Sequence, residues 1–192
     1  MGKIKYLPKI MDLFKKNPVV SIRDIKLLTK NENYSNVLLN YLLKKGEIKR
    51  IEKGFYTLYN DPTLIVFAIR PSYIGLQAAL SIHNLWEQET NTIIVTPKKI
   101  RIGKREVFDT NVIVRRIDKK YFFGYDLINY DNFLIPVSDK EKTIIDLIYF
   151  RQPIEEKIFS KIKIDKKKMK EYIKKYPKFV KKRVLKIFKL DD

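Results

Sequence analysis

Five residues in the N-terminal third have the types and spacing needed to read DNA bases. Asn36, Asn40 and Lys44 are four residues apart, so they share one face of a helix that contains them. Asparagine pairs bidentately with adenine in the major groove, and lysine suits guanine or phosphate. Tyr34 and Ser35 lie at the predicted entry of this helix, where contacts with thymine methyl groups or phosphates are expected. We predict that all five contact base pairs.

Three basic residues follow in the next segment of the chain. Lys49 and Arg50 belong to a short run of mixed apolar and polar residues over 48–51, and a second such run follows over 55–58. Lys53 and Gly54 lie between the two runs. Such a pattern predicts a β-hairpin. We expect the three basic side chains to contact the phosphate backbone or the minor groove.

Side chains suited to catalysis are scarce. His83 is the only histidine and there is no cysteine, which excludes histidine clusters and thiolate metal sites. His83 lies in an apolar segment and is interpreted as structural. Asp126, Glu141 and Asp146 leave a metal-dependent nuclease as an alternative, although acidic residues near a helix start also interact favourably with the helix dipole. We predict no catalytic residue, no metal and no cofactor, and hence a protein that is not an enzyme.

Three helices are expected before the hairpin. Apolar residues spaced three and four apart indicate a helix over 3–16, which Asn17-Pro18 ends. Ser21 and Asp24 resemble a capping box that opens a second helix ending near residue 30. Ser35 is expected to cap a third helix running to about residue 45, with four residues facing the core: Val37, Leu38, Tyr41 and Leu42. Three helices and a basic hairpin predict a winged helix-turn-helix domain over residues 1–62.

The rest of the chain predicts an α+β domain and a helical extension. Over residues 63–150 we expect helices within 71–83 and over 139–150, the second capped by Ser138, around a mostly antiparallel sheet. Its strands are predicted over 92–96, 100–108, 112–117, 121–128 and 133–137. Residues 151–192 predict three amphipathic helices, over 153–162, 165–176 and 177–190.

The charge lies mainly at the two ends of the chain. The net charge is +19, with 32 lysines among the 41 basic residues. Residues 1–62 carry 13 basic and 6 acidic groups, residues 63–150 carry 12 and 10, and residues 151–192 carry 16 and 6. A general bias toward lysine would raise all three segments, whereas a polyanionic partner explains basic ends around a nearly neutral middle. The basic extension is open to three interpretations: phosphate contacts, an acidic protein partner, or dimerisation.

The same composition limits where the protein acts. Hydrophobic residues make up 45% of the chain and charged residues 33%, which argues against disorder. The N-terminus lacks the apolar core of a signal peptide, and no run approaches the roughly eighteen apolar residues of a membrane span. We therefore expect a cytoplasmic protein with no membrane partner.

The order of several motifs resembles a known family. The hairpin segment reads Gly-Glu-Ile-Lys-Arg-Ile-Glu-Lys-Gly-Phe-Tyr, and Pro-Ser-Tyr-Ile-Gly-Leu-Gln-Ala-Ala-Leu and Ser-Asp-Lys-Glu-Lys-Thr-Ile-Ile-Asp-Leu follow it. Together they resemble the AbiEi antitoxins and transcriptional regulators of type IV toxin–antitoxin systems, over about residues 3 to 150. The resemblance implies a winged helix that binds operator DNA and represses its own operon. It also implies a second domain linked to antagonism of a nucleotidyltransferase-like toxin.

The sequence thus predicts a DNA-binding transcriptional regulator that autoregulates as an antitoxin. Its expected partners are double-stranded operator DNA, a nucleotidyltransferase-like toxin and, in a homodimer, a second copy of the chain. The alternative is a protein-interaction module that binds an acidic partner without specific DNA binding.

Overall fold

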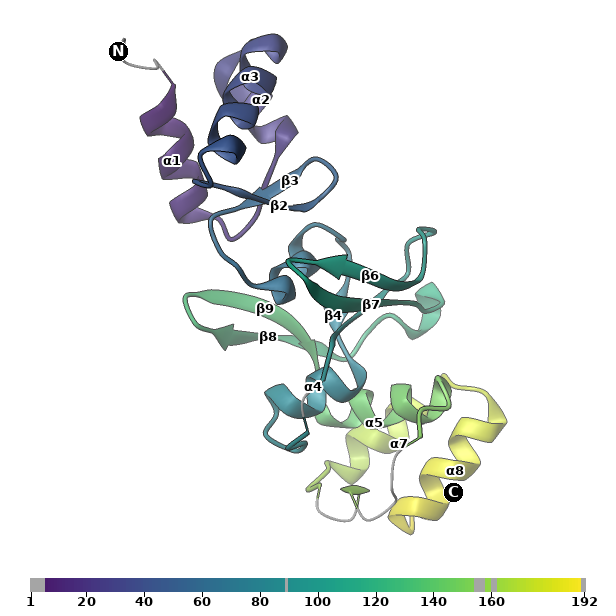
Figure 1. Cartoon of the computed structure of the whole chain (residues 1–192). Coiled ribbons are helices and arrows are strands. Elements are labelled where there is room, and N and C mark those ends of the chain that lie inside the picture. Colours follow the sequence, from purple (N-terminus) through teal and green to yellow (C-terminus); the bar gives the residue numbers. More distant parts are fainter. Residues whose placement is uncertain (1–5, 89, 154–157, 160–161, 191–192) are drawn as a thin grey trace. The chain divides into compact units, whose positions relative to one another are not determined.

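The computed structural model describes residues 6–88, 90–153, 158–159 and 162–190, which form a mixed α+β fold (Figure 1). The chain divides into two compact units. The N-terminal unit comprises Met1–Arg70 with Glu106–Thr110, and the C-terminal unit comprises Pro71–Arg105 with Asn111–Asp192. The first boundary lies later than the predicted residue 62, because the 3-10 helix Pro62–Phe67, which contacts the strand Lys49–Glu52, groups with the N-terminal unit.

Three helices open the N-terminal unit: α1 (Leu7–Lys16), α2 (Ile22–Thr29) and α3 (Glu32–Lys44). Helix α1 begins later than residue 3 and has Pro8 in its first turn, where the missing backbone N–H is not needed. Residues 3–5 of the predicted helix lie outside the described residues. Helix α2 begins with the predicted capping box, because the Asp24 backbone N–H donates to Ser21 Oγ at 3.2 Å and the Ser21 N–H donates to Asp24 Oδ2 at 3.0 Å.

The third helix begins four residues earlier than predicted. Its N-cap is Asn31, whose Oδ1 accepts a hydrogen bond from the Tyr34 backbone N–H at 2.9 Å. The prediction that Ser35 caps this helix is wrong. The Ser35 hydroxyl donates to the Asn31 carbonyl at 2.7 Å and lies 2.6 Å from Thr29 Oγ1, so it is used inside the turn between α2 and α3.

The N-terminal unit also contains a three-stranded sheet. Strands β2 (Lys49–Glu52) and β3 (Phe55–Thr57) form the predicted antiparallel hairpin, with Gly54 at φ +79° in the turn. The short strand β1 (Val20–Ser21) pairs antiparallel with β3, which gives the order β1-β3-β2. This pairing connects the start of α2 to the hairpin.

One face of each helix supplies the core of the N-terminal unit. Its buried residues are Ile10, Phe14, Val20, Ile25, Leu38, Leu39, Leu42, Ile48 and Tyr56. Burial of each such aliphatic side chain contributes about 1.5–3 kcal/mol. Val37, which the sequence predicts in the core, is instead 68% exposed. The reason is that Leu38, Leu39 and Leu42 direct α3 to the core with a face that leaves Val37 on the opposite side.

A six-stranded mixed sheet has the order β6-β7-β5-β4-β9-β8. Its strands are β4 (Tyr73–Ile74), β5 (Thr92–Thr96), β6 (Gly103–Val107), β7 (Thr110–Arg116), β8 (Tyr125–Tyr130) and β9 (Phe133–Ser138). Strand β4 runs antiparallel to β5 and β8 runs antiparallel to β9, but β4 with β9 and β5 with β7 are parallel. The prediction of a mostly antiparallel sheet is not confirmed, because the sheet mixes parallel and antiparallel pairs. The parallel pairs join strands that are distant in sequence, and the two-residue strand β4 that links them was not predicted.

Helices of the C-terminal unit are α4 (Leu76–Ile82), α5 (Lys140–Tyr149), α7 (Lys166–Ile173) and α8 (Lys178–Phe188), with a 3-10 helix over Lys119–Tyr121. Asp139, rather than the predicted Ser138, caps α5 by accepting a hydrogen bond from the Lys142 backbone N–H at 2.7 Å. His83, at the end of α4, has its Nε2 2.7 Å from the carbonyl oxygen of Ser138, the last residue of β9.

The basic C-terminal segment packs within the C-terminal unit. Its apolar stripe is buried at Met169, Ile173, Tyr176, Val180 and Val184, and both α7 and α8 contact α5. The predicted helix over 153–162 lies largely outside the described residues. Because the stripe is used inside the unit, helices α7 and α8 are part of this fold and not a separate basic arm.

Candidate nucleic-acid interface

The solvent-facing side of α3 carries a narrow row of exposed residues. Asn33, Val37, Asn40 and Lys44 are all exposed, at spacings of four, three and four residues. This spacing places them on a single face of a helix with 3.6 residues per turn. Asn36 lies at the side of the row and is half-buried. Two of the five residues predicted to read bases, Asn40 and Lys44, are thus fully on this surface and Asn36 borders it.

The other two predicted base-reading residues face inward. Ser35 is fully buried and uses its hydroxyl in the turn between α2 and α3. Tyr34 packs edge-on against Tyr6, with ring centroids 5.6 Å apart, and belongs to the margin of the core. The Tyr34 hydroxyl is buried and has no hydrogen-bond partner in the described part of the chain. Neither side chain presents a polar group to solvent, and their predicted contact with DNA stays a prediction.

The three basic residues of the β2–β3 hairpin differ in their exposure to solvent. Arg50 and Lys53 are exposed, whereas Lys49 is half-buried and its Nζ donates to Asn60 Oδ1 at 2.6 Å. The register of β2 against β3 shifts between Arg50 and Glu52, so the exposure of each side chain, and not strand alternation, distinguishes these residues. Arg50 and Lys53 are therefore the hairpin residues best placed for phosphates.

The end of α3 adds a cation next to this surface. Lys45 lies over the Tyr41 ring, 4.7 Å from its centroid, and within 3.7 Å of Glu47. The pKa of Lys45 is raised above its ordinary value, first by its interaction with Tyr41 and then by Glu47. Lys45 therefore stays charged at every physiological pH.

A second polar site lies inside the C-terminal unit, and the sequence analysis did not find it. We call it the Lys142 cluster: Tyr73, Lys142, Asp146 and Tyr176. Lys142 Nζ donates to Tyr73 Oη at 2.8 Å and forms an ion pair with Asp146, although both charged side chains are completely buried. Asp146 also accepts hydrogen bonds from Tyr73 at 2.6 Å and Tyr176 at 2.9 Å.

Aromatic rings surround this buried ion pair. Lys142 Nζ lies 5.2 Å from the centroid of Tyr73 and 5.6 Å from those of Phe123 and Tyr176. Burial lowers the pKa of Lys142 and raises that of Asp146, and in each case the opposite charge of the partner counteracts the effect. Burial, followed by the charge of Asp146, raises the pKa of both tyrosines. These groups therefore act as one coupled unit, in which removal of one charge leaves the other unpaired in an apolar site.

The start of α5 continues this network to α7. Lys168 lies 3.0 Å from Asp139 Oδ2, and the Tyr172 hydroxyl donates to the same oxygen at 2.9 Å. Glu141 Oε1 accepts a hydrogen bond from the Asp165 backbone N–H at 2.8 Å. Burial and the hydrogen bond to Asp139 raise the pKa of Tyr172 to about 12. The C-terminal helices are therefore attached to α5 by polar contacts as well as by the apolar stripe.

These contacts occupy two of the three carboxylates considered for a nuclease. Asp146 is held by Lys142 and two tyrosines, Glu141 accepts from the α7 cap, and Asp126 is exposed on β8. Among the residues that the structure describes, no group of three or more His, Asp or Glu side chains is placed to hold a metal ion.

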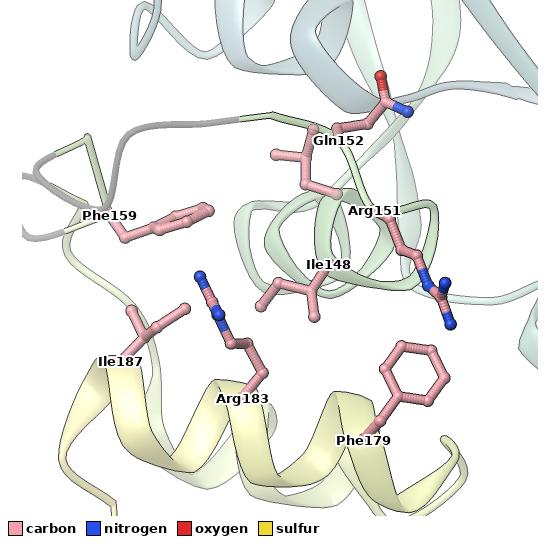
Figure 2. A pocket seen from close by; sticks show the side chains of 8 residues that line it. Ile148, Arg151, Gln152, Phe159, Phe179, Arg183 and Ile187 are labelled. Carbon is pink, nitrogen blue, oxygen red and sulfur yellow. The ribbon is translucent and has the colours of Figure 1, made fainter.

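A cavity of about 320 Å³ lies between α5 and α8 in the C-terminal unit. Figure 2 shows Ile148, Phe159 and Ile187 on its walls, with the side chains of Arg151 and Arg183 beside them. The Arg151 guanidinium lies 5.6 Å from the centroid of the Phe179 ring, which is 45% exposed. The cavity combines apolar walls with two guanidinium groups.

No helix in the described ranges has the length and apolar character needed to cross a membrane. The chain has no significant match among curated proteins. Residues 8–59 match the family described as "Transcriptional regulator, AbiEi antitoxin". This match confirms the resemblance for the helices and hairpin of the N-terminal unit, whereas the resemblance over residues 60–150 stays a prediction. Over residues 8–59, this chain is therefore similar to the AbiEi antitoxins, a family of transcriptional regulators.

Proposed function

We propose that this protein is a sequence-specific DNA-binding transcriptional regulator that acts in the cytoplasm as the autoregulating antitoxin of an AbiE-like type IV toxin–antitoxin system. In this proposal α2 and α3 form a helix-turn-helix and the β2–β3 hairpin is its wing. Helix α3 enters the major groove, and Arg50 and Lys53 contact phosphates or the minor groove. The protein acts by binding and has no catalytic step or cofactor.

The observation that carries the proposal is the exposed face of α3. The amide and ammonium groups of Asn33, Asn40 and Lys44 stand in one exposed row, from which they can meet the base edges of successive pairs. The exposed Arg50 and Lys53 on the following hairpin supply charge for the flanking phosphates. The similarity of residues 8–59 to a family of transcriptional regulators supports the same conclusion.

The test is binding of the full chain to the DNA upstream of its own gene and to a scrambled sequence of equal length, at two salt concentrations. We expect a preference for the upstream DNA that persists at the higher salt. Equal affinity for both sequences that collapses with salt contradicts the proposal, because a +19 chain attracts any polyanion.

The cavity between α5 and α8 favours a second candidate function, binding of an acidic protein partner such as the toxin. Residues 151–192 carry 16 basic and 6 acidic groups, and apolar walls next to Arg151 and Arg183 suit an acidic segment with an aliphatic or aromatic side chain. Co-purification with the product of the adjacent gene, lost in Phe179→Ala and kept in an Asn40→Ala control, supports this function. A complex that both variants retain contradicts it.

Hydrolysis is tested separately. Plasmid DNA incubated with the protein and Mg²⁺ or Mn²⁺ is expected to remain intact. Cleavage that Asp126→Asn abolishes overturns the proposal that the protein acts by binding alone.

A further inference from the structure

Val37 is a large aliphatic side chain in an otherwise polar row. It is 68% exposed, and its neighbours along the face, Asn33, Asn40 and Lys44, are polar and exposed. The core of the N-terminal unit does not use it, since α3 contributes Leu38, Leu39 and Leu42 to that core. An exposed aliphatic residue at the centre of a polar row points to an apolar group in the ligand.

We propose that Val37 is a specificity-determining residue that contacts thymine methyl groups, and that the row Asn33, Val37, Asn40 and Lys44 selects an A·T-rich half-site in the major groove. This inference rests on the proposed function, because it takes α3 as the helix that reads DNA. What the inference adds is the base composition of the DNA that α3 prefers.

The chemistry of the row favours A·T pairs. The C5-methyl group of thymine is the apolar group that the major groove displays, and the N6 and N7 atoms of adenine match an asparagine amide. Arginine, the side chain that most often reads guanine bidentately, does not occur in α3, whose sequence is ENYSNVLLNYLLK. Lys44, at the last position of α3, is the one residue in the row that suits guanine or phosphate.

The spacing of the row fits neighbouring base pairs. Val37 and Asn40 are three residues apart, which corresponds to about 4.5 Å along the helix axis. Successive bases of one strand are about 3.4 Å apart along the duplex. Val37 and Asn40 can therefore meet the thymine methyl of one pair and the adenine of the next pair without distortion of the helix.

A selection experiment distinguishes failure of this inference from failure of the proposed function. Selection from random duplexes by the full-length protein is expected to enrich sites with an A·T-rich core. An enriched but G·C-rich core overturns the inference and leaves specific DNA binding intact. The absence of any enriched sequence contradicts the proposed function itself.

The contact itself is tested by removal of single methyl groups. In the selected site each thymine is replaced in turn by deoxyuridine, which keeps the base pair and lacks the methyl. At the contacted position we expect about a fourfold loss of affinity, because one buried methyl-sized group is worth about 0.8 kcal/mol and 1.4 kcal/mol is a factor of ten. The Val37→Ser variant is expected to bind the site with thymine and the site with deoxyuridine at that position with equal affinity.

Leu27 provides the matched control. It is an exposed aliphatic residue of the same unit, 77% exposed on α2, and lies outside the row. Leu27→Ala is expected to keep the full dependence on the methyl group. Unfolding midpoints of both variants close to that of the parent protein establish that the fold is intact. Equal sensitivity of Val37→Ser and the parent protein to deoxyuridine at every position overturns the assignment.

Discussion

Lys142 and Asp146, one helical turn apart on α5, form an ion pair in which neither side chain is exposed to solvent. The cost of removing both charges from water is offset by their mutual attraction and by the hydroxyls of Tyr73 and Tyr176. The pair therefore stabilises the C-terminal unit only while it remains complete.

Removal of the lysine charge is expected to be strongly destabilising. Lys142→Met leaves the Asp146 carboxylate buried without a cation, and we expect the free energy of unfolding to fall by about 3–5 kcal/mol. Urea unfolding followed by the fluorescence of Trp86, the single tryptophan, reports on the C-terminal unit in which it lies. The double variant Lys142→Met/Asp146→Leu is expected to lose less, because no unpaired charge remains. A double variant as unstable as the sum of the two single ones would show that the charges are not coupled.

The Tyr172 hydroxyl makes the attachment of α7 sensitive to alkaline pH. Its pKa is raised to about 12 in the folded protein, from an ordinary value of 10.0, by burial and by its hydrogen bond to Asp139. A raised folded-state pKa means that the stabilisation is complete below pH 10 and is lost as the pH rises toward 12. We expect the stability difference between the parent protein and Tyr172→Phe to shrink by about 1 kcal/mol between pH 8 and pH 11, a value reduced for solvent screening of the half-exposed ring.

The measurement is urea unfolding of both proteins at the two pH values. Taking the difference cancels the titration of the lysines that the two proteins share. A difference that stays constant with pH would contradict a role for this proton.

Gly124 is required by the backbone and by the packing of α7. Its φ is +69°, and a Cβ atom there would lie 2.8 Å from Tyr172 Cε2 and 3.1 Å from Lys142 Cβ. Gly124→Ala is expected to destabilise the C-terminal unit by about 2–4 kcal/mol, about 1–2 kcal/mol from the left-handed backbone and the remainder from the clash. In a Tyr172→Ala background the same substitution should cost less, because the ring is absent. Strictly additive effects in this cycle, followed by Trp86 fluorescence, would show that the ring causes no part of the loss.

Asn40 is expected to set preference at one base pair. Its amide lies in the exposed row of α3, and loss of a bidentate contact with adenine relaxes discrimination by about 1–3 kcal/mol. Selection of binding sites by the parent protein and by Asn40→Ala should differ at a single position. Asn129→Ala, which changes an exposed asparagine of β8, serves as the control and should leave the profile unchanged. Identical profiles for the parent protein and Asn40→Ala would remove Asn40 from the interface.

Arg50 is expected to contribute affinity without sequence preference. Arg50→Ala should weaken binding to all duplexes similarly and reduce the slope of log affinity against log salt by about one, because one phosphate contact is lost. Titrations at several salt concentrations measure that slope. Lys15→Ala removes an exposed charge at the end of α1 and should change the slope little. A loss confined to one DNA sequence would mean that Arg50 reads a base.

Local signals explain what the sequence alone predicts correctly. The capping box of Ser21 and Asp24 involves residues three apart, so it forms wherever the chain turns into a helix. The β2–β3 hairpin is likewise set by nearby residues around Gly54. The apolar stripes of α1, α7 and α8 have helical periodicity that is visible without a partner.

The start of α3 shows where local signals are insufficient. Asn31 and Ser35 are both good N-cap residues, and the sequence offers no way to choose between them. The choice depends on Thr29, whose hydroxyl lies 2.6 Å from Ser35 Oγ when the helix begins at Glu32. Ser35 therefore lies inside the helix, where it is buried, whereas the exposure of Val37 follows from the face that Leu38, Leu39 and Leu42 turn to the core.

By itself, the sequence determined that three helices and a basic hairpin come first, that the middle mixes strands with helices, and that the end is helical and amphipathic, because each of these depends on contacts within a few residues. Only the tertiary structure decided the mixed sheet and the Lys142 cluster. Tyr73, Phe123, Lys142 and Tyr176 come from four separated segments, and strands β4 and β9 pair across more than sixty residues of sequence. Such long-range contacts are stabilised by the burial of side chains in the complete fold, and the sequence of a short segment does not determine them.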